Sequence, residues 1–360
     1  MVLEQSADDM PYRLYVFGSN GEGQLGIEAA DIVQNPTIAH SWPAEKGISA
    51  LCGGDNHTLI IASDGSLHHA GSTEKFQLGP VSSGQPKNHH FKRTDKLGVN
   101  FCAAACESSA YIRNGAPKMV DGSTVTTISI EGTDHWGEGA FGTLELPQPA
   151  IDFAAGNWHY VTILSNGDVL GWGKSRLDQL GPRLSAQQRI TKPTLIEENI
   201  PFRPVKVVCG KEFTYLASDP SAGEHHLLGR DKFSLRSTMP ENIKDWKQIG
   251  ATWHAIFVLF RNGSLAAWGK ENMWKLLPKD LPAIEQIAVG SEHVLALTRD
   301  GKLISWGWGK HGNCGNLTML DDEVKNDMVS GVWNNIDIPG TIKAICAGFC
   351  TSFVLTENVE

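Results

Sequence analysis

The amino-acid sequence predicts an all-β protein, a seven-bladed β-propeller closed by strands from both chain ends. Three observations support this prediction. Glycine accounts for 38 of the 360 residues, and such an excess over the average of ~7% indicates many tight turns. A motif of about fifty residues recurs along the chain. The chain begins with the outer half of this motif and ends with its inner half, as the closure of a ring requires.

The motif is clearest in three copies that align without a gap. Each copy opens with Gly-x-x-His and continues through an apolar run to an Asp-Gly or Asn-Gly pair. In all three, the turn glycine lies eight residues after the histidine, the next glycine six further on, and the last glycine eight beyond that. The three histidines are His57, His159 and His293. Such regular spacing is typical of a repeat architecture.

Weaker copies fill the intervals between these three. We expect seven units, which open at Gly54, Ala104, Gly156, Gly210, Gly250, Gly290 and Gly348. In the weaker copies the position of the histidine is taken by Glu107, Phe213, Trp253 and Thr351. Half a motif at Tyr15–Gly26 completes the last unit, which stops before its own turn glycine. The segments 80–98 and 316–337 are predicted to be long loops, and the sequence assigns them no role.

Each unit is predicted to consist of short strands joined by tight turns. The Asp-Gly and Asn-Gly pairs at 64–65, 166–167, 262–263 and 300–301 are typical of hairpin turns, since these residues tolerate positive φ. Trp172, Trp268 and Trp306 each precede a glycine at one shared position of the motif. We expect these three indoles to pack between blades.

The ends of the chain and its cysteines suggest a location. Residues 1–12 are predicted to be a short acidic segment, and residues 13–360 a single propeller. The first ten residues contain no apolar stretch typical of a secretory signal. The apolar run 255–260 is far shorter than the ~18 residues of a membrane span. Seven cysteines are an odd number, which fits a reducing compartment. We therefore expect a cytoplasmic protein without membrane contact, and nuclear localisation stays open.

No catalytic motif is present in the sequence. The chain has no phosphate-binding Gly-x-x-x-x-Gly-Lys-Ser/Thr loop and no His-Glu-x-x-His zinc motif, so we expect neither an enzyme nor a cofactor. Cys52, Cys102 and Cys346 share one motif position in different units, which favours packing over metal binding. The net charge of −9 opposes direct binding to nucleic acid.

The Gly-x-x-His opening, the Asp-Gly turn, the Trp-Gly pair and the Gln-Leu-Gly close resemble the regulator-of-chromosome-condensation repeat. Members of that family form seven-bladed β-propellers closed by strands from both termini. The resemblance extends from about Tyr15 to Leu355. It implies the fold more strongly than the function, because this propeller serves unrelated tasks.

A narrower resemblance concerns the segment 306–315, with its doubled Trp-Gly and its Asn-Cys-Gly close, and the opening at Phe17–Gly21. Both are similar to the fungal α-tubulin-suppressor, or killer-toxin-insensitivity, group of propellers. The resemblance implies a non-enzymatic adaptor that forms a heterodimer with a small zinc-binding protein. Such a pair supports diphthamide synthesis on elongation factor 2 and Elongator-dependent modification of tRNA wobble uridines, so Elongator would be an indirect partner.

The alternative is a guanine-nucleotide exchange factor for a Ran-like small GTPase, since secretion-regulating exchange factors have a similar Trp-Gly-Trp segment. Exchange would need an acidic, polar wedge on one rim, to which Asp55 or Glu292 could contribute. Equivalent loops of all blades gather on one rim, and aromatic side chains mixed with charges favour protein binding. The candidate partner-binding residues are Trp158, Glu212, Trp253, His254, Glu292, His293, Trp308, Lys310 and His311. For the three motif histidines, a purely structural role is the competing interpretation.

Overall fold

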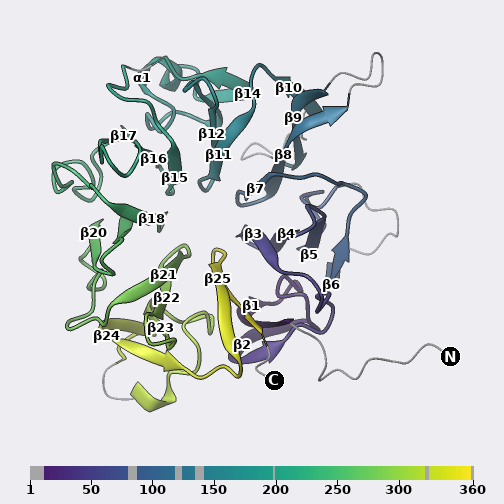
Figure 1. Cartoon of the computed structure of the whole chain (residues 1–360), viewed down its shortest axis with the longest axis vertical. Helices are drawn as coiled ribbons and strands as arrows, with labels where there is room; N and C mark the ends of the chain where they lie inside the picture. Colours follow the sequence, from purple (N-terminus) through teal and green to yellow (C-terminus); the bar gives the residue numbers. More distant parts are fainter. Residues whose placement is uncertain are drawn as a thin grey trace.

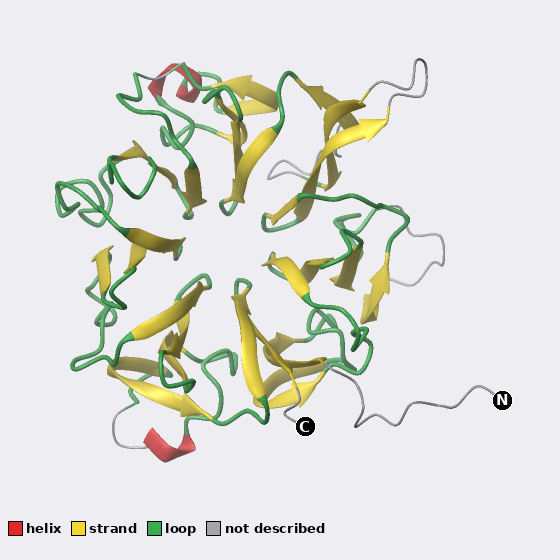
Figure 2. Cartoon of the chain, in the orientation of Figure 1, coloured by secondary structure: helices red, strands yellow, loops and turns green. Residues whose placement is uncertain are grey.

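In the computed structural model, seven antiparallel sheets surround a central axis like the blades of a propeller (Figures 1 and 2). The structure describes residues 12–79, 87–117, 124–133, 142–197, 199–320 and 324–357. Within these residues, five sheets have four strands and two have three. The predicted all-β, seven-bladed propeller is therefore confirmed.

We number the blades in chain order, with the strands of each blade running from the axis outward. Blade 1 comprises β3 (Ile48–Gly53), β4 (His57–Ala62), β5 (Leu67–Ser72) and β6 (Lys87–Arg93). Blade 2 comprises β7 (Phe101–Ala104), β8 (Ser108–Pro117), β9 (Thr124–Gly132) and β10 (Gly142–Leu146). Blade 3 comprises β11 (Ala150–Ala155), β12 (His159–Leu164), β13 (Val169–Lys174) and β14 (Arg189–Leu195), with the short helix α1 (Pro182–Ser185) before β14.

Blades 4 and 5 have three described strands each. Blade 4 comprises β15 (Lys206–Cys209), β16 (Phe213–Ala217) and β17 (His225–Gly229), and blade 5 comprises β18 (Trp246–Ala251), β19 (Ala255–Phe260) and β20 (Leu265–Gly269). Blade 6 comprises β21 (Ile284–Val289), β22 (His293–Thr298), β23 (Leu303–Trp308) and β24 (Met328–Ile336), with the 3-10 helix η1 (Thr318–Leu320) before β24.

Blade 7 joins the two ends of the chain. Its inner strands β25 (Thr341–Ala347) and β26 (Thr351–Glu357) come from the C-terminal part, and its outer strands β1 (Tyr12–Asn20) and β2 (Ala30–Ile38) come from the N-terminal part. β1 pairs with β26 in antiparallel register from Tyr12 opposite Glu357 to Gly18 opposite Thr351. The structure confirms the predicted closure by strands from both ends.

The hydrophobic core lies between neighbouring blades. Successive inner strands contact one another around the ring, from β3 and β7 through to β25 and β3. Trp172, Trp268 and Trp306 are buried in the clusters between blades, as predicted. These clusters make the ring a continuous core and leave its two faces free.

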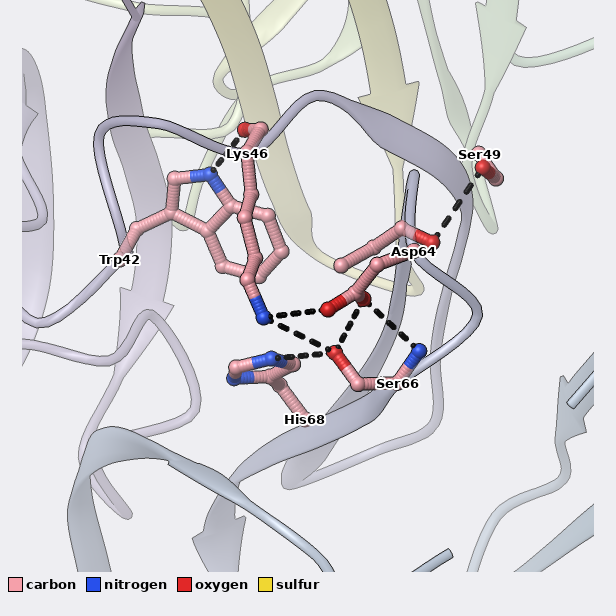
Figure 3. Close-up of polar contacts among 7 residues, drawn as sticks. Trp42, Lys46, Ser49, Asp64, Ser66 and His68 are labelled. Atoms are coloured by element: carbon pink, nitrogen blue, oxygen red, sulfur yellow. Dashed lines mark hydrogen bonds and ion pairs between the residues drawn. The ribbon is translucent and has the colours of Figure 1, made fainter. Parts of the chain in front are cut away.

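The two faces differ in the loops they carry. The loop face carries the turns between the first and second strands and the connections from the third strand. The hairpin face carries the Asp-Gly and Asn-Gly turns, whose glycines have the positive φ that the sequence predicts, 75° at Gly65 and 91° at Gly263. On the hairpin face, the Lys46 ammonium lies 2.7 Å from the Asp64 carboxylate and 3.3 Å from the Ser66 hydroxyl (Figure 3). His68 Nε2 lies 3.1 Å from the same hydroxyl, so these polar contacts link the Asp64–Gly65 turn of blade 1 to Lys46 and His68.

Two predicted unit openings are wrong. In blade 1, Gly54 N–H donates to the carbonyl of His57 across the loop tip. The equivalent bond joins Ala105 to Ser108 in blade 2, and Thr252 to Ala255 in blade 5. The openings are therefore Ala105 and Thr252, and not Ala104 and Gly250.

A packing rule explains this register. A Cβ on Gly54 would lie 2.3 Å from the His57 ring, and a Cβ on Gly210 would lie 2.1 Å from the Phe213 ring. A large side chain three residues after the opening therefore requires glycine there. Where that side chain is small, as in blades 2 and 5, alanine or threonine fits.

The predicted long loops 80–98 and 316–337 are also corrected in part. β6 lies within the first segment, and η1 and β24 lie within the second. Residues 80–86 and 321–323 of these segments lie outside the described residues. These segments thus supply the outermost strands of blades 1 and 6, whose alternation of apolar and polar residues is too irregular to predict.

Candidate functional site

The tips of the inner loops are joined by a chain of backbone hydrogen bonds on the loop face. Trp253 N–H donates to the carbonyl of Ser291 at 2.8 Å, and Ser291 N–H donates to that of Phe349 at 2.9 Å. Lys211 N–H donates to the Trp253 carbonyl at 2.9 Å. This chain fixes the tips of blades 4 to 7 relative to one another, so their side chains form one preorganised surface.

Two aromatic side chains stand at the mouth of the central channel. In the corrected register, Trp253 and Phe349 occupy equivalent positions, two residues before Ala255 and Thr351. Their rings meet edge to face with centroids 5.6 Å apart. Both also line the channel, a cavity of about 240 Å³ at the centre of the ring. The Lys211 ammonium lies 4.8 Å from the Trp253 ring, a cation–π geometry.

Charged side chains border these aromatics. His254 Nδ1 lies 3.6 Å from a Glu292 carboxylate oxygen, and these side chains are only 16% and 18% exposed. The Lys232 ammonium lies 2.8 Å from the Glu212 carboxylate. Although burial opposes it, the nearby Lys232 lowers the pKa of Glu212 below its usual value. The predicted residues Glu212, Trp253, His254 and Glu292 are thus brought together.

Trp308, Lys310 and His311 extend this surface across blade 6. Trp308 N–H donates to the Glu292 carbonyl at 2.8 Å, and the Trp308 and His311 rings meet edge to face at 5.1 Å. Burial and the charge of Lys310 lower the pKa of His311, while Asp55 opposes this shift. The pKa of Asp55 is raised by burial and by Glu107, so acidic and basic groups meet at the junction with blade 1.

We define the loop-face cluster as the set formed by Glu212, Trp253, His254, Glu292, Trp308, His311 and Phe349. Trp158 lies on the same face in blade 3 and is half-buried, and its carbonyl accepts a bond from Lys174 N–H. Lys310 is exposed beside His311. The cluster combines rigid aromatics with adjustable charges, as protein-binding surfaces do.

One candidate, His293, is corrected by the structure. Its side chain is 0% exposed, so it presents no surface to a partner. Its Nε2 lies 3.0 Å from the Ser352 hydroxyl, which itself donates to the Asn313 carbonyl. Because that hydroxyl proton is used, His293 Nε2 is the donor. Burial lowers the pKa of His293 to about 3, so the ring is neutral and links blade 6 to blade 7.

The sequence did not reveal Phe349, Lys211, Lys232 and Phe233 as members of this face. Phe349 could have been found from the corrected register, which places it at the position of Trp253. Lys232 and Phe233 lie in an irregular loop after β17, where the motif is lost, and no spacing indicates them. Phe233 meets His254 edge to face at 4.9 Å, a contact between blades 4 and 5.

The cysteines do not form a site on this face. Cys52 and Cys102 line the central channel with their sulfur atoms 3.3 Å apart. Burial raises the pKa of Cys346 to about 12. In the described part of the chain, no three His, Cys, Asp or Glu side chains are arranged to hold a metal ion. No helix there is long and apolar enough to cross a membrane.

These features define a seven-bladed propeller with a preorganised aromatic and charged loop face. Residues 166–217 and 284–313 match the family model of the regulator of chromosome condensation (RCC1) repeat. The chain is therefore a propeller that contains RCC1 repeats, with RCC1-like propellers as its homologues.

Individual relatives agree with this assignment. The chain is 26% identical to an RCC1 repeat-containing protein of Schizosaccharomyces pombe, over 96% of this chain and 99% of the relative. It is 23% identical to the secretion-regulating guanine nucleotide exchange factor of Bos taurus, over 91% of this chain and 78% of that protein. It spans only 24% of the human X-linked retinitis pigmentosa GTPase regulator, at 24% identity.

Among solved structures, Prp20p of Saccharomyces cerevisiae superimposes with a TM-score of 0.75 at 16% identity, covering 98% of this chain and 93% of Prp20p. The structure of Prp20p is described together with its binding to Gsp1p and histones. At this identity the similarity concerns the fold. A shared fold does not identify the partner of this chain, which depends on the chain's own surface.

Proposed function

We propose that this protein is a non-enzymatic adaptor that binds a small zinc-containing protein through the loop-face cluster. In this role it supports diphthamide synthesis on elongation factor 2 and Elongator-dependent modification of wobble uridines in tRNA. The pair would act in the cytoplasm, with nuclear localisation open. The identity of the partner is inferred from a resemblance to the killer-toxin-insensitivity group of propellers, which lies in segment 306–315 and in the opening at Phe17–Gly21.

The observation that carries the adaptor proposal is the arrangement of Trp253, Phe349 and Trp308. Binding hot spots are enriched in tryptophan and lie in well-packed surroundings. Here the three rings are half-buried and held by loop tips whose backbones bond to one another. A surface that is rigid before binding loses little conformational entropy on association, which favours affinity.

A second candidate is nucleotide exchange on a Ran-like GTPase. Two findings favour it: the Bos taurus relative is an exchange factor, and Prp20p binds Gsp1p. Acidic side chains also lie on the loop face, among them Asp55, Glu107 and Glu292. The two candidates use the same face, so the identity of the partner distinguishes them.

Affinity purification of the tagged chain from a fungal extract, followed by mass spectrometry and zinc analysis, tests the proposal. We expect a small protein at a one-to-one ratio, with zinc recovered in proportion to it. Trp253→Ala and Trp308→Ala should each lose this protein, whereas Trp333→Ala, a half-buried indole on β24, should retain it. Stoichiometric recovery of a Ran-like GTPase without zinc would establish the second candidate instead.

A further inference from the structure

Positive charge is concentrated on one part of the loop face, although the whole chain carries a net charge of −9. The cations come from three neighbouring blades, 3, 4 and 5. They are Lys174, Arg176, Lys211, Arg230, Lys232 and Lys270. Such a local concentration on an acidic protein indicates a surface for a negatively charged ligand.

The positive charge is only partly compensated. Lys232 pairs with Glu212 at 2.8 Å, and Arg230 Nε lies 3.6 Å from Asp178. Among the described residues, no carboxylate forms an ion pair with the other four cations, which are Lys174, Arg176, Lys211 and Lys270. Burial lowers the pKa of Lys174, and the charges of Arg176 and Lys211 lower it further, while Glu212 opposes this shift.

Three of these cations line a pocket of about 410 Å³, and Lys211 and Lys270 lie beside it, against the rings of Trp253 and Phe233. Arg176, Arg230 and Lys232 line it together with Phe233, Trp253 and the buried Leu235. The Lys232 and Lys270 ammonium groups lie 5.2 Å and 5.1 Å from the Phe233 ring. The cation–π contacts keep both ammonium groups beside the pocket, where Glu212 compensates Lys232 but no described carboxylate forms an ion pair with Lys270. The pocket therefore offers apolar walls and positive charge together.

We propose that this basic pocket binds an acidic segment of a partner protein. Aspartate or glutamate side chains of the segment would meet Lys211, Lys270 and Arg176, and one apolar side chain would lie between Phe233 and Trp253. The inference rests on the proposed function, because it adds the chemistry of the partner to the same face.

The surroundings favour a short acidic peptide over a nucleic acid. Glu212 and Asp231 also line the pocket and would repel the closely spaced charges of a continuous phosphate backbone, whereas a peptide can place uncharged side chains beside them. The net charge of −9 opposes a long polyanion beyond the pocket. A peptide can alternate carboxylates with apolar side chains, and so match both the cations and the aromatic walls.

The test uses a fluorescein-labelled, glutamate-rich peptide with a leucine at its centre, and fluorescence anisotropy of the full chain. The controls are the same peptide with glutamine in place of glutamate, and oligothymidylate of equal length. We expect the glutamate peptide to bind at least about tenfold more tightly than either control. Binding should weaken as salt is raised, since Arg176, Arg230 and Lys232 are exposed and Lys211 and Lys270 are only half-buried. Tighter binding of oligothymidylate, or equal binding of the glutamine peptide, would overturn the proposal.

The double variant Lys211→Glu/Lys270→Glu should weaken binding of the glutamate peptide by at least about tenfold. A matched double variant, Lys192→Glu/Lys244→Glu, makes the same change in net charge at exposed positions outside the pocket. It should bind the peptide like the unmodified chain. An equal loss in both variants would show a non-specific charge effect and refute the basic pocket.

Purification of the partner separates this proposal from the proposed function. If the unmodified chain retains a stoichiometric partner and Lys211→Glu/Lys270→Glu retains it equally well, the adaptor function stands and the basic pocket is wrong. If the unmodified chain retains no partner while the peptide binds as expected, the pocket stands as an acidic-peptide site and the adaptor function is wrong.

Discussion

Replacement of His293 by phenylalanine tests the structural role of the motif histidines. The protein itself uses phenylalanine at this position in blade 4, where Phe213 is buried and faces Gly210 as His293 faces Gly290. His293→Phe therefore keeps the shape of the loop tip. It removes the hydrogen bond to Ser352, but the Ser352 hydroxyl still donates to the Asn313 carbonyl. At about pH 7.5 we expect a modest loss in the free energy of unfolding, of about 1 kcal/mol.

The pH dependence gives the sharper result. The folded chain holds the pKa of His293 at about 3, against 6.5 for an exposed histidine. Below pH 6.5 the unfolded chain binds a proton that the folded chain does not, so acid favours unfolding. This effect begins near pH 6.5 and continues down to the folded pKa. The stability of the unmodified chain should thus fall by about 1.4 kcal/mol per pH unit from this one group. The phenylalanine variant lacks this contribution.

Urea unfolding of both proteins at about pH 7.5 and pH 5.5 measures the effect. Other titrating groups contribute equally to both proteins, so the difference between them isolates His293. We expect the difference to shift by about 1.4 kcal/mol in favour of the variant at the lower pH. A difference that does not change with pH would refute a neutral, fully buried His293.

Three further predictions concern other parts of the molecule. Trp253→Ala and Trp308→Ala should each weaken the complex with the co-purified partner by at least about tenfold, whereas the control Trp333→Ala should not. Unchanged affinity in the Trp253 and Trp308 variants would show that the loop-face cluster is not the binding site. Gly210→Ala should cost about 1–3 kcal/mol of stability because its Cβ would overlap the Phe213 ring, but little when Phe213 is also replaced by alanine. If urea unfolding shows that the double variant loses as much stability as the two single variants together, the packing rule at the unit openings is wrong. Burial raises the pKa of Cys106 to about 12 and that of Cys350 to about 11. Iodoacetamide should therefore alkylate both thiols at least about a hundredfold more slowly in the folded chain than in the urea-unfolded chain. Rapid modification of either thiol in the folded chain, measured by mass spectrometry, would contradict this prediction.

The fold could be predicted from the sequence because its determinants are local and repeated. The glycine spacing after His57, His159 and His293 indicates the lengths of the strands and turns. The half motif at each end of the chain indicates that strands from both ends close the ring. The register of blades 2 and 5 could not be read from spacing. There, Ala105 and Thr252 replace the opening glycine because Ser108 and Ala255 are small. Gly250 resembles an opening glycine in the sequence, but it is required by a different contact. A Cβ on Gly250 would lie 2.5 Å from Val289 on the neighbouring inner strand.

The candidate site could be predicted only in part. Trp253, Glu292 and Trp308 were identified because the equivalent loops of a propeller gather on one rim. The charge pattern of the basic pocket could not be predicted, because Lys211 and Phe233 of blade 4 and Lys270 of blade 5 are far apart in the sequence and gather only in the folded ring. The sequence does not reveal the burial of His293, because a repeated histidine beside variable residues does not indicate whether its ring points outward or into the next blade.

Hydrogen exchange of the chain, alone and in complex with its co-purified partner, tests the central claim most directly. The account predicts that the partner slows exchange at the loop-face tips, around residues 253–254, 291–292, 308–311 and 349–350. The Asp-Gly and Asn-Gly turns at 64–65, 166–167, 262–263 and 300–301 should exchange at the same rate in both samples. Protection of those turns, with the loop-face tips unchanged, would contradict it.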